Sequence, residues 1–558
     1  MIRAMRSLTY LFLLAVLSLQ MFSCKKSGTE KGIAKETILA SEKLLGLHFT
    51  ESERDSMNGQ IITDSTYYQQ LRNHRLTNDI PPVLVFDPLP AGFVIPDRQI
   101  PVAWKIPENV RLPDDRNKLA FYSLPELASL IRTRKISSVE LTRFFLERLK
   151  KYGDTLECVI TITEDYALGQ ARKMDEEIRS GHYRGILHGI PYGIKDLFAF
   201  PGFPTTWGAG PYKVQYLEET ATVISKLEDA GAVLIAKLTL GALAMGDVWY
   251  GGTTRNPWNL KQGSSGSSAG SAAATVAGLV PFAIGTETWG SIVSPSTRCG
   301  ATGLRPTFGR VSRTGAMALS WSMDKIGPIC RNAYDCAIVF NSIRGTDGRD
   351  QSVVDAPFNF QPVKDMGSLR IGYLKDLFDA DTLLKSADSL SLLVFEKLGA
   401  HMVPVSLPDS FPVEALSIIL FAEAAAAFDE LTRSDRDSLL VEQQRDAWPN
   451  TFRASRFIPA VEYINANRIR QELIRETNLL FRDFDVIIAP SFEGDQLLLT
   501  NLTGHPCVVL PDGFLNDGSP ASICLLGNLF DEATILAVAA KFQEATAFED
   551  KHPPLFEE

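Results

Sequence analysis

From residue 117 onward, two hydrophobic patterns alternate along the chain. Segments with apolar residues at helical spacing predict helices, and the short apolar runs between them predict strands buried between helices. One such run, Ala232 to Ala236, directly follows a predicted helix that ends at Gly231. The pattern indicates an α/β fold with a parallel or mixed sheet. The expected helices here cover residues 124–133, 137–152, 220–230 and 271–279, and the expected strands cover residues 159–163 and 232–236, with a further strand ending at Lys195.

The carboxyl-terminal half keeps the same alternation. A helix is expected over residues 463–482, followed by strands at 485–490 and 506–510, and residues 408–460 read as helical but irregular. No internal repeat is evident, so we expect one large catalytic domain over residues 117–558.

Residues 36–116 have a different pattern. Residues 36–80 are polar and helix-prone, with a possible helix cap at Thr50 before Glu51 and Glu53. Eight prolines between Pro81 and Pro113 exclude a regular helix and predict an extended strap over the main domain. We therefore treat residues 36–116 as a helical and proline-rich amino-terminal extension.

The amino terminus has the pattern of an export signal. Two arginines, Arg3 and Arg6, precede an apolar run from residue 8 to residue 19, which is short for a membrane span. Ser23 and Cys24 follow as a processing site, and the stretch Met21 to Cys24 resembles a relaxed bacterial lipobox. We expect a lipoprotein-type signal over residues 1–23, lipidation of Cys24 and a tether over residues 24–35. An ordinary secretory signal or an uncleaved anchor would also export the protein.

Composition narrows the function. The 558-residue chain has a net charge of −10 and no long run of Lys or Arg, which argues against a nucleic-acid partner. Its six cysteines beyond Cys24 show no paired metal-ligand spacing, so we expect buried free thiols and no metal.

Two serine-bearing glycine-rich loops are the strongest signs of chemistry. The first runs from Gly266 to Ser271 and the second from Gly285 to Ile292. Glycine lets backbone N–H groups close around a developing oxyanion, and serine needs a neighbouring base to become a nucleophile. The base is the open question.

Three bases or arrangements are possible. A Ser-His-Asp triad would need one of seven histidines, none of which lies in a glycine-flanked loop. A nucleophile elbow would use Ser268 within Gly266–Gly270, but the preceding segment is polar and broken by Pro257 rather than an apolar strand.

The third base is Lys195. A free lysine with a pKa of about 10.4 is almost never neutral at pH 7, so burial must lower its pKa by roughly three units. Lys195 lies between apolar segments, which makes that burial credible. A structural ion pair with Asp196 is the alternative.

Five ordered motifs then resemble the amidase signature family. They include Gly189–Asp196, the two serine loops, Gly303–Ser312, Asp324–Pro328 and Asn501–Pro506, and the resemblance covers roughly residues 118–555. It implies an α/β/α sandwich with a large mixed, mostly parallel central sheet flanked by helices.

The resemblance also implies a Ser-cisSer-Lys triad. Ser291 would be the acyl-forming nucleophile, Ser267 beside a cis peptide bond would relay the proton, and neutral Lys195 would be the base. Ser268 would support the hydrogen-bond network. The backbone N–H groups of Thr288, Trp289, Gly290 and Ser291 would form the oxyanion hole.

Two positions depart from the family pattern. Trp289 stands where glycine is usual, so its ring would narrow the pocket or brace the loop, and the usual arginine after Ile292 is missing. We expect Glu287 to pair with another cation, Arg298 being the nearest in sequence. Ala269 replaces a usual glycine, which is a mild change.

These observations predict an exported amidase that hydrolyses a linear carboxamide without metal or organic cofactor. The expected location is the periplasm or outer membrane of a bacterium, with membrane contact only through the lipid on Cys24. The substrate would be a small-molecule or peptide amide, and the oligomeric state is not predicted. A catalytically silent surface protein that binds amides or peptides is an alternative, and one component of a tRNA-dependent amidotransferase is another.

Overall fold

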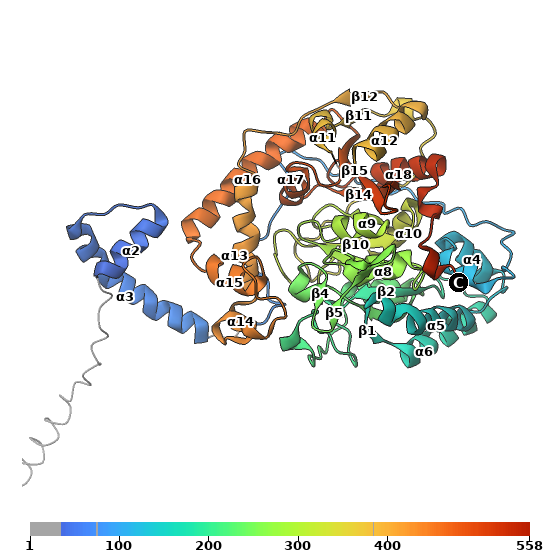
Figure 1. Cartoon of the computed structure of the whole chain (residues 1–558), viewed down its shortest axis with the longest axis horizontal. Coiled ribbons are helices and arrows are strands. Elements are labelled where there is room, and N and C mark those ends of the chain that lie inside the picture. Colours follow the sequence, from blue (N-terminus) through green and yellow to red (C-terminus); the bar gives the residue numbers. More distant parts are fainter. Residues whose placement is uncertain (1–34, 74–75, 383) are drawn as a thin grey trace, which may run out of the picture. The chain divides into compact units, whose positions relative to one another are not determined.

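The computed structural model describes residues 35–73, 76–382 and 384–558 (Figure 1). The predicted signal, the lipidation site Cys24 and nearly all of the tether lie outside these residues. No helix within the described residues is both long and apolar enough to cross a membrane. The chain divides into two compact units, Met1–Thr77 and Asn78–Glu558, which are described separately.

The first unit contains two helices, α2 (Lys35–Leu45) and α3 (Glu51–Asn73). The expected cap at Thr50 is present, because its backbone N–H donates to Glu53 Oε2 at 2.6 Å and its Oγ1 accepts from the Glu53 N–H. The two helices are joined by an ion pair of 3.1 Å between Arg54 and the buried Glu42.

The second unit is built around a mixed sheet that has eleven strands in the part of the chain described by the structure. In spatial order the strands are β1 (Val159–Ile162), β3 (Val233–Leu238), β2 (Pro191–Lys195), β8 (Ala283–Glu287), β10 (Lys325–Cys330), β9 (Thr302–Arg305), β14 (Cys507–Phe514), β15 (Pro520–Gly527), β13 (Val486–Pro490), β11 (Ile371–Tyr373) and β12 (Met402–Pro404). Two short ribbons, β4 (Val248–Trp249) with β5 (Gly252–Thr253) and β6 (Arg255–Asn256) with β7 (Asn259–Gly263), lie outside it.

The α/β fold with a large mixed sheet flanked by helices is confirmed. Parallel pairing occurs in two runs, β3–β2–β8 and β13–β11–β12. The remaining pairings, including those in the middle of the sheet, are antiparallel. Apolar runs do not distinguish these arrangements, because an antiparallel sheet covered on both faces also buries both sides of its strands.

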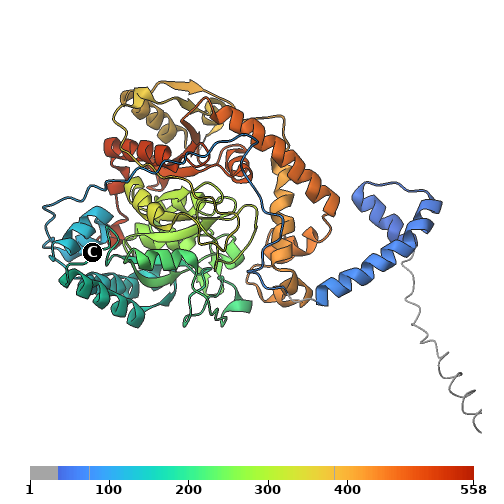
Figure 2. The same ribbon diagram turned by 180° about the vertical axis from the view of Figure 1, so that it is seen from behind.

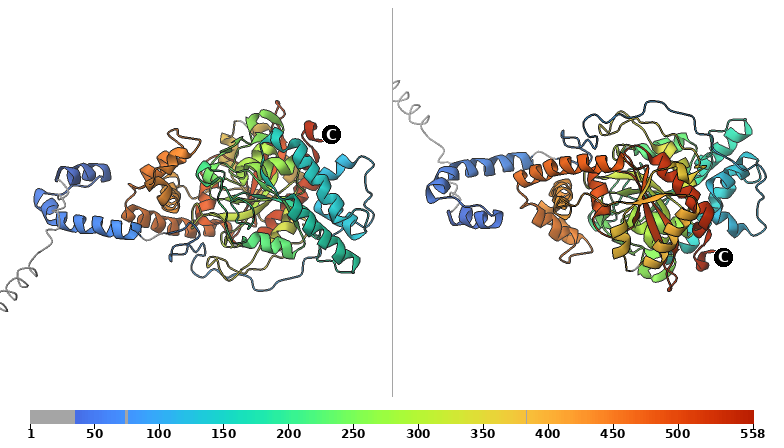
Figure 3. Two further views of the ribbon diagram at one scale, coloured as in Figure 1. Left: turned by 90° about the horizontal axis from the view of Figure 1, so that it is seen from below. Right: turned by 90° about the horizontal axis from the view of Figure 1, so that it is seen from above.

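Helices cover both faces of the sheet, and the alternation of side chains shows it. Cys507 and Val509 of β14 pack with Val293 of α9 (Val293–Cys299), whereas Val508 and Leu510 belong to the core that contains Ile535 of α18 (Glu532–Thr546). Figure 3 shows the helices on the two sides. The other helices of this unit are α4 (Leu124–Arg132), α5 (Ser138–Leu156), α6 (Glu164–Arg179), α7 (Thr222–Asp229), α8 (Ala269–Val276), α10 (Ala333–Ile343), α11 (Lys375–Ala380), α12 (Lys385–Lys397), α13 (Ile418–Ala427), α14 (Asp429–Arg433), α15 (Trp448–Ser455), α16 (Ala460–Phe481) and α17 (Gln496–Thr503).

The proline-rich segment runs over this unit as an extended strap, visible as the thin blue ribbon in Figure 2. Aromatic side chains attach it: Phe86 packs edge-on against Phe308, and Trp104 stacks on Phe360. The side-chain amide of Gln99 exchanges two hydrogen bonds of 2.9 Å with the backbone of Phe358. The compact unit therefore begins at Asn78 and includes the strap.

Candidate active site

The three parts of the site meet at one edge of the sheet. Strand β2 ends at Lys195, and its parallel neighbour β8 ends at Glu287, just before the loop that carries Ser291. Because the carboxyl ends of parallel neighbours lie at the same edge, Lys195 and the second serine loop come together. The first serine loop reaches the same place immediately before α8.

Lys195 is the centre of this cluster and is completely buried. Its Nζ donates to Ser267 Oγ at 2.8 Å, to Thr286 Oγ1 at 2.8 Å and to Ser268 Oγ at 3.2 Å. All three partners are neutral hydroxyl groups, so no carboxylate is in direct contact to hold the charged form of the amine.

Burial lowers the pKa of Lys195 to about 7, even though Asp324 and Glu287 at longer range oppose the shift. A substantial fraction of the amine is therefore neutral at pH 7. This is the property that a lysine base requires.

The alternative role of Lys195 as the ion-pair partner of Asp196 is wrong. Asp196 instead pairs with Lys237 of β3 at 2.8 Å, and both side chains are fully buried. Thr206 also donates to Asp196, through its backbone N–H at 2.8 Å and through its hydroxyl. The carboxylate has its own partners, which leaves Lys195 to the serines.

The three candidate serines differ in accessibility. Ser268 and Ser267 are 0% and 1% exposed, whereas Ser291 is 8% exposed. The Ser268 hydroxyl donates to the carbonyl of Thr286 at 3.0 Å and accepts from the N–H of Thr286 at 3.2 Å. A buried hydroxyl with these partners supports the loop and does not fit the exposed nucleophile of an elbow.

The peptide bond between Gly266 and Ser267 is cis, as the family resemblance implied. The N–H of Ser268 donates to the carbonyl of Ser291 at 3.1 Å, which ties the two serine loops together. Among the described residues, no hydrogen bond links the hydroxyls of Ser267 and Ser291. The structure thus joins Lys195 to Ser267 and places Ser291 on the adjoining loop.

The loop from Thr288 to Ser291 has backbone N–H groups that are not used elsewhere within the described chain. Gly290 adopts a positive φ of 83°, a conformation that glycine readily accepts and that turns this loop toward α9. Trp289 is 40% exposed and does not line the cavity described below, so its ring does not narrow that cavity.

The expected pairing of Glu287 with Arg298 is wrong. Glu287 forms an ion pair of 3.0 Å with Arg305 of β9, and both side chains are fully buried. Its other partners are the amide of Asn501 and the backbone N–H groups of Ile292 and Val293, at 2.8–2.9 Å. Arg298 lies on the exposed side of α9, whereas the sheet brings Arg305 to Glu287.

No histidine in the described part of the chain contacts Ser267, Ser268 or Ser291. The two fully buried histidines have other partners, because His188 bonds to the Met174 carbonyl at 3.0 Å and His505 bonds to Thr503 at 2.9 Å. The geometry therefore favours the lysine arrangement over Ser-His-Asp. The six described cysteines are free and buried, as expected.

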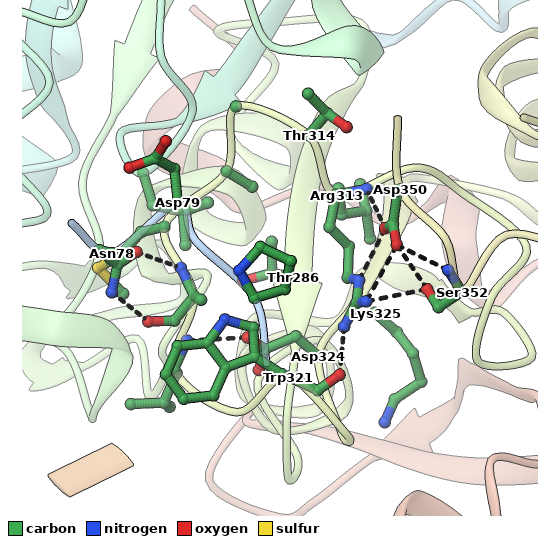
Figure 4. Close-up of a pocket in the computed structure, with 18 of the residues that line it drawn as sticks. Asn78, Asp79, Thr286, Arg313, Thr314, Trp321, Asp324, Lys325, Asp350 and Ser352 are labelled. Atoms are coloured by element: carbon green, nitrogen blue, oxygen red, sulfur yellow. Dashed lines mark hydrogen bonds and ion pairs between the residues drawn. The ribbon is translucent and has the colours of Figure 1, made fainter. Parts of the chain in front are cut away.

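A cavity of about 210 Å³ adjoins the cluster through Thr286, Thr288 and Asp324 (Figure 4). Asp324 accepts from Thr288 Oγ1 at 2.6 Å and from the backbone N–H groups of Leu319 and Ser320. Sequence reasoning missed Thr286 as a partner of Lys195, although it lies inside the second serine loop. It also missed the cavity role of residues 78–85.

The fold and the cluster define a serine enzyme of the α/β class whose base is lysine. The family model described as Amidase matches residues 140–499, and the chain belongs to this amidase family, the amidase signature enzymes, which act on C–N bonds.

The chain is also similar to individual members. It is 34% identical to one component of the glutamyl-tRNA(Gln) amidotransferase of Methylococcus capsulatus, over 77% of this chain and 98% of that protein. The solved native peptide amidase of Stenotrophomonas maltophilia is 26% identical with a TM-score of 0.68, and the match covers 79% of this chain and all of that one. A bacterial aryl acylamidase has the same fold at 24% identity, with a TM-score of 0.68 over 78% and 98% of the two chains.

Proposed function

We propose that the protein is an amidase that hydrolyses a linear carboxamide through an acyl-enzyme on Ser291. The observation that carries the proposal is the buried Lys195, whose lowered pKa and 2.8 Å bond to Ser267 provide a base beside the accessible Ser291. The family membership and the similarity to a solved peptide amidase support it.

In the first half-reaction Ser291 Oγ attacks the amide carbon while its proton passes to Ser267 Oγ. Ser267 passes its own proton to the neutral amine of Lys195. The backbone N–H groups from Thr288 to Ser291 stabilise the oxyanion. When the C–N bond breaks, the proton returns through Ser267 to the leaving nitrogen, so amine or ammonia departs. A water molecule then repeats the sequence on the acyl-enzyme and releases the carboxylate.

Labelling with a fluorophosphonate, followed by mass spectrometry of the modified peptide, tests this assignment. We expect modification at Ser291 that disappears in Ser291→Ala and slows in Lys195→Ala. Ser294→Ala is the matched control, because Ser294 lies three residues away and bonds only to Ser265 through its hydroxyl. Modification at Ser268 would support the elbow instead, and unmodified folded protein would support a catalytically silent amide-binding protein.

A second candidate function is that of the amidotransferase component, favoured by the relatives of that name. Hydrolysis of free L-glutamine separates the two functions. Rapid release of ammonia from glutamine, with no turnover of other carboxamides, would favour the amidotransferase.

The amino-terminal sequence supports export, with lipidation of Cys24 and a periplasmic or outer-membrane location. Expression in a bacterium fed an alkyne-bearing fatty acid tests this part. Wild-type protein should carry the label and Cys24→Ser should lose it. An unlabelled wild-type protein in the cytoplasmic fraction would contradict it.

A further inference from the structure

The beginning of the strap forms one wall of the cavity beside the proposed active site. Asn78 holds one end, because the N–H of Ala318 donates to Asn78 Oδ1 at 2.7 Å and Asn78 Nδ2 donates to the Ala318 carbonyl at 2.9 Å. Phe86 holds the other end against Phe308, with the guanidinium of Arg470 over its ring at 3.6 Å. Residues 79–85, here named the cavity span, lie between these two anchors.

The cavity span exposes apolar side chains next to the site. Leu84 is 86% exposed and Val85 is 45% exposed, and both line the cavity. Single exposed apolar residues are common, but these two border a cavity whose other apolar lining is buried. That lining includes Met317, Leu319 and Ile326. A ligand with an apolar substituent would cover Leu84 and Val85 and complete an apolar pocket.

The charged groups that line the cavity are largely paired with one another. Arg313 pairs with Asp350 at 2.9 Å, and Arg349 pairs with Glu219 at 2.8 Å. In Figure 4, Arg313, Asp350 and Ser352 lie on one side of the cavity, and Asn78 and Asp79 lie on the other. With both arginines engaged, the cavity suits an apolar substituent better than the carboxylate of a free amino acid.

We propose that Leu84 and Val85 determine substrate specificity by contacting an aliphatic or aromatic substituent of the amide substrate. This inference rests on the proposed function and extends it. The cavity span lies outside the family match at residues 140–499, so this contact belongs to the chain's own amino-terminal extension.

Two fluorophosphonates that differ only in carrying a methyl or an octyl group test the inference on the full chain. Wild-type protein should be modified faster by the octyl probe. In the double variant Leu84→Ser/Val85→Ser, we expect the octyl rate to fall about tenfold or more, the range seen when an apolar contact in a pocket is lost. The methyl rate should stay within about twofold, since that probe does not reach the span.

Val83→Ser is the matched control, because Val83 is 94% exposed, belongs to the same span and does not line the cavity. It should change neither rate, and unchanged melting temperatures should show that all variants are folded. An unchanged octyl rate in the double variant, or equal slowing of both probes, would overturn the specificity role while leaving the proposed function intact. Wild-type protein that neither probe modifies at Ser291 would overturn the proposed function and this inference together.

Discussion

A lysine that acts as a base must be neutral, and at the residue scale Lys195 meets that condition through burial. Its contacts are hydroxyl groups from both serine loops, so the surrounding structure does not stabilise the charged amine by direct pairing. The nearby acids are engaged elsewhere: Glu287 with Arg305, and Asp196 with Lys237. This separation of acids from the amine allows desolvation to dominate the pKa of Lys195.

The pH dependence of kcat/KM follows from the pKa of Lys195, which burial lowers to about 7. Below that pH the amine is protonated and cannot accept a proton, so the rate should rise about tenfold per pH unit and level off above pH 8. Initial rates on a neutral amide from pH 5 to pH 9 measure this profile. A flat profile across this range would exclude a base with that pKa.

Lys195→Arg separates the base role from a structural role. Arginine keeps a positive charge and hydrogen-bond donors but does not lose its proton in proteins. We expect a loss of roughly 100-fold or more in kcat, with little change in KM. Circular dichroism and a melting curve should first show that the variant is folded, and wild-type kcat in it would contradict the base role.

Asp388 gives a stability prediction. Its carboxylate is 1% exposed, and its oxygens have no hydrogen-bond partner among the described residues. Burial, followed by the nearby acids Asp512, Asp381 and Glu493, raises the pKa of Asp388 to about 8. Between the unfolded pKa and this value the folded state binds more protons, so its contribution to stability falls as pH rises from about 4 to 8.

Asp388→Asn removes this ionisation. At pH 9 the variant should be more stable than wild type by about 1–3 kcal/mol, the range for a buried polar group left unsatisfied, and the advantage should vanish near pH 5. Denaturant midpoints at the two pH values measure it. An equal shift at both pH values would point to packing rather than to charge.

At the element scale, the site depends on how the sheet brings separate segments together. Glu287 at the end of β8, Arg305 at the end of β9 and Asn501 on α17 form one buried group that holds the turn into α9. This turn carries Ser291. The ion pair therefore positions the nucleophile loop without contacting the reacting atoms.

Arg305→Met should leave the Glu287 carboxylate buried without its cation. Breaking a buried pair in this way typically reduces stability by about 3–5 kcal/mol. Denaturant unfolding measures the loss, and the double variant Glu287→Gln/Arg305→Met should recover part of it. Arg298→Met is the control, because Arg298 is exposed and should shift the midpoint little. Equal effects of the two arginine variants would contradict the assignment of the pair.

At the scale of the whole molecule, the chain consists of an amino-terminal helical unit and a catalytic unit that begins at Asn78. The strap belongs to the catalytic unit because Phe86, Gln99 and Trp104 bind it to segments more than 200 residues away in sequence. Removing the strap would expose the apolar surface that it covers.

A chain of residues 78–558 should therefore fold alone and be modified by the methyl fluorophosphonate at the wild-type rate. A chain of residues 117–558 should melt at a lower temperature, because it lacks the strap and its aromatic contacts. Melting curves and labelling rates measure both effects. Equal melting temperatures for the two chains would show that the strap adds no stability.

Much of the fold could be predicted from local pattern. The helices expected over 137–152 and 463–482 correspond to α5 and α16, and the strand expected over 485–490 corresponds to β13. Hydrophobic periodicity and capping residues act over a few neighbouring positions, so a single sequence reveals them. The antiparallel middle of the sheet was not predictable in this way, because strand order depends on contacts between distant segments.

The sequence by itself determined the family, the cluster of Lys195 with the two serine loops, and the free cysteines, because these follow from residue types at set spacings. Only the tertiary structure decided that Arg305 rather than Arg298 meets Glu287, that Thr286 binds Lys195, and that residues 78–85 border the cavity. The physical reason is the same in each case. Burial, pairing and the lowered pKa of Lys195 arise from groups that are far apart in the chain and meet only when the sheet and its strap are assembled.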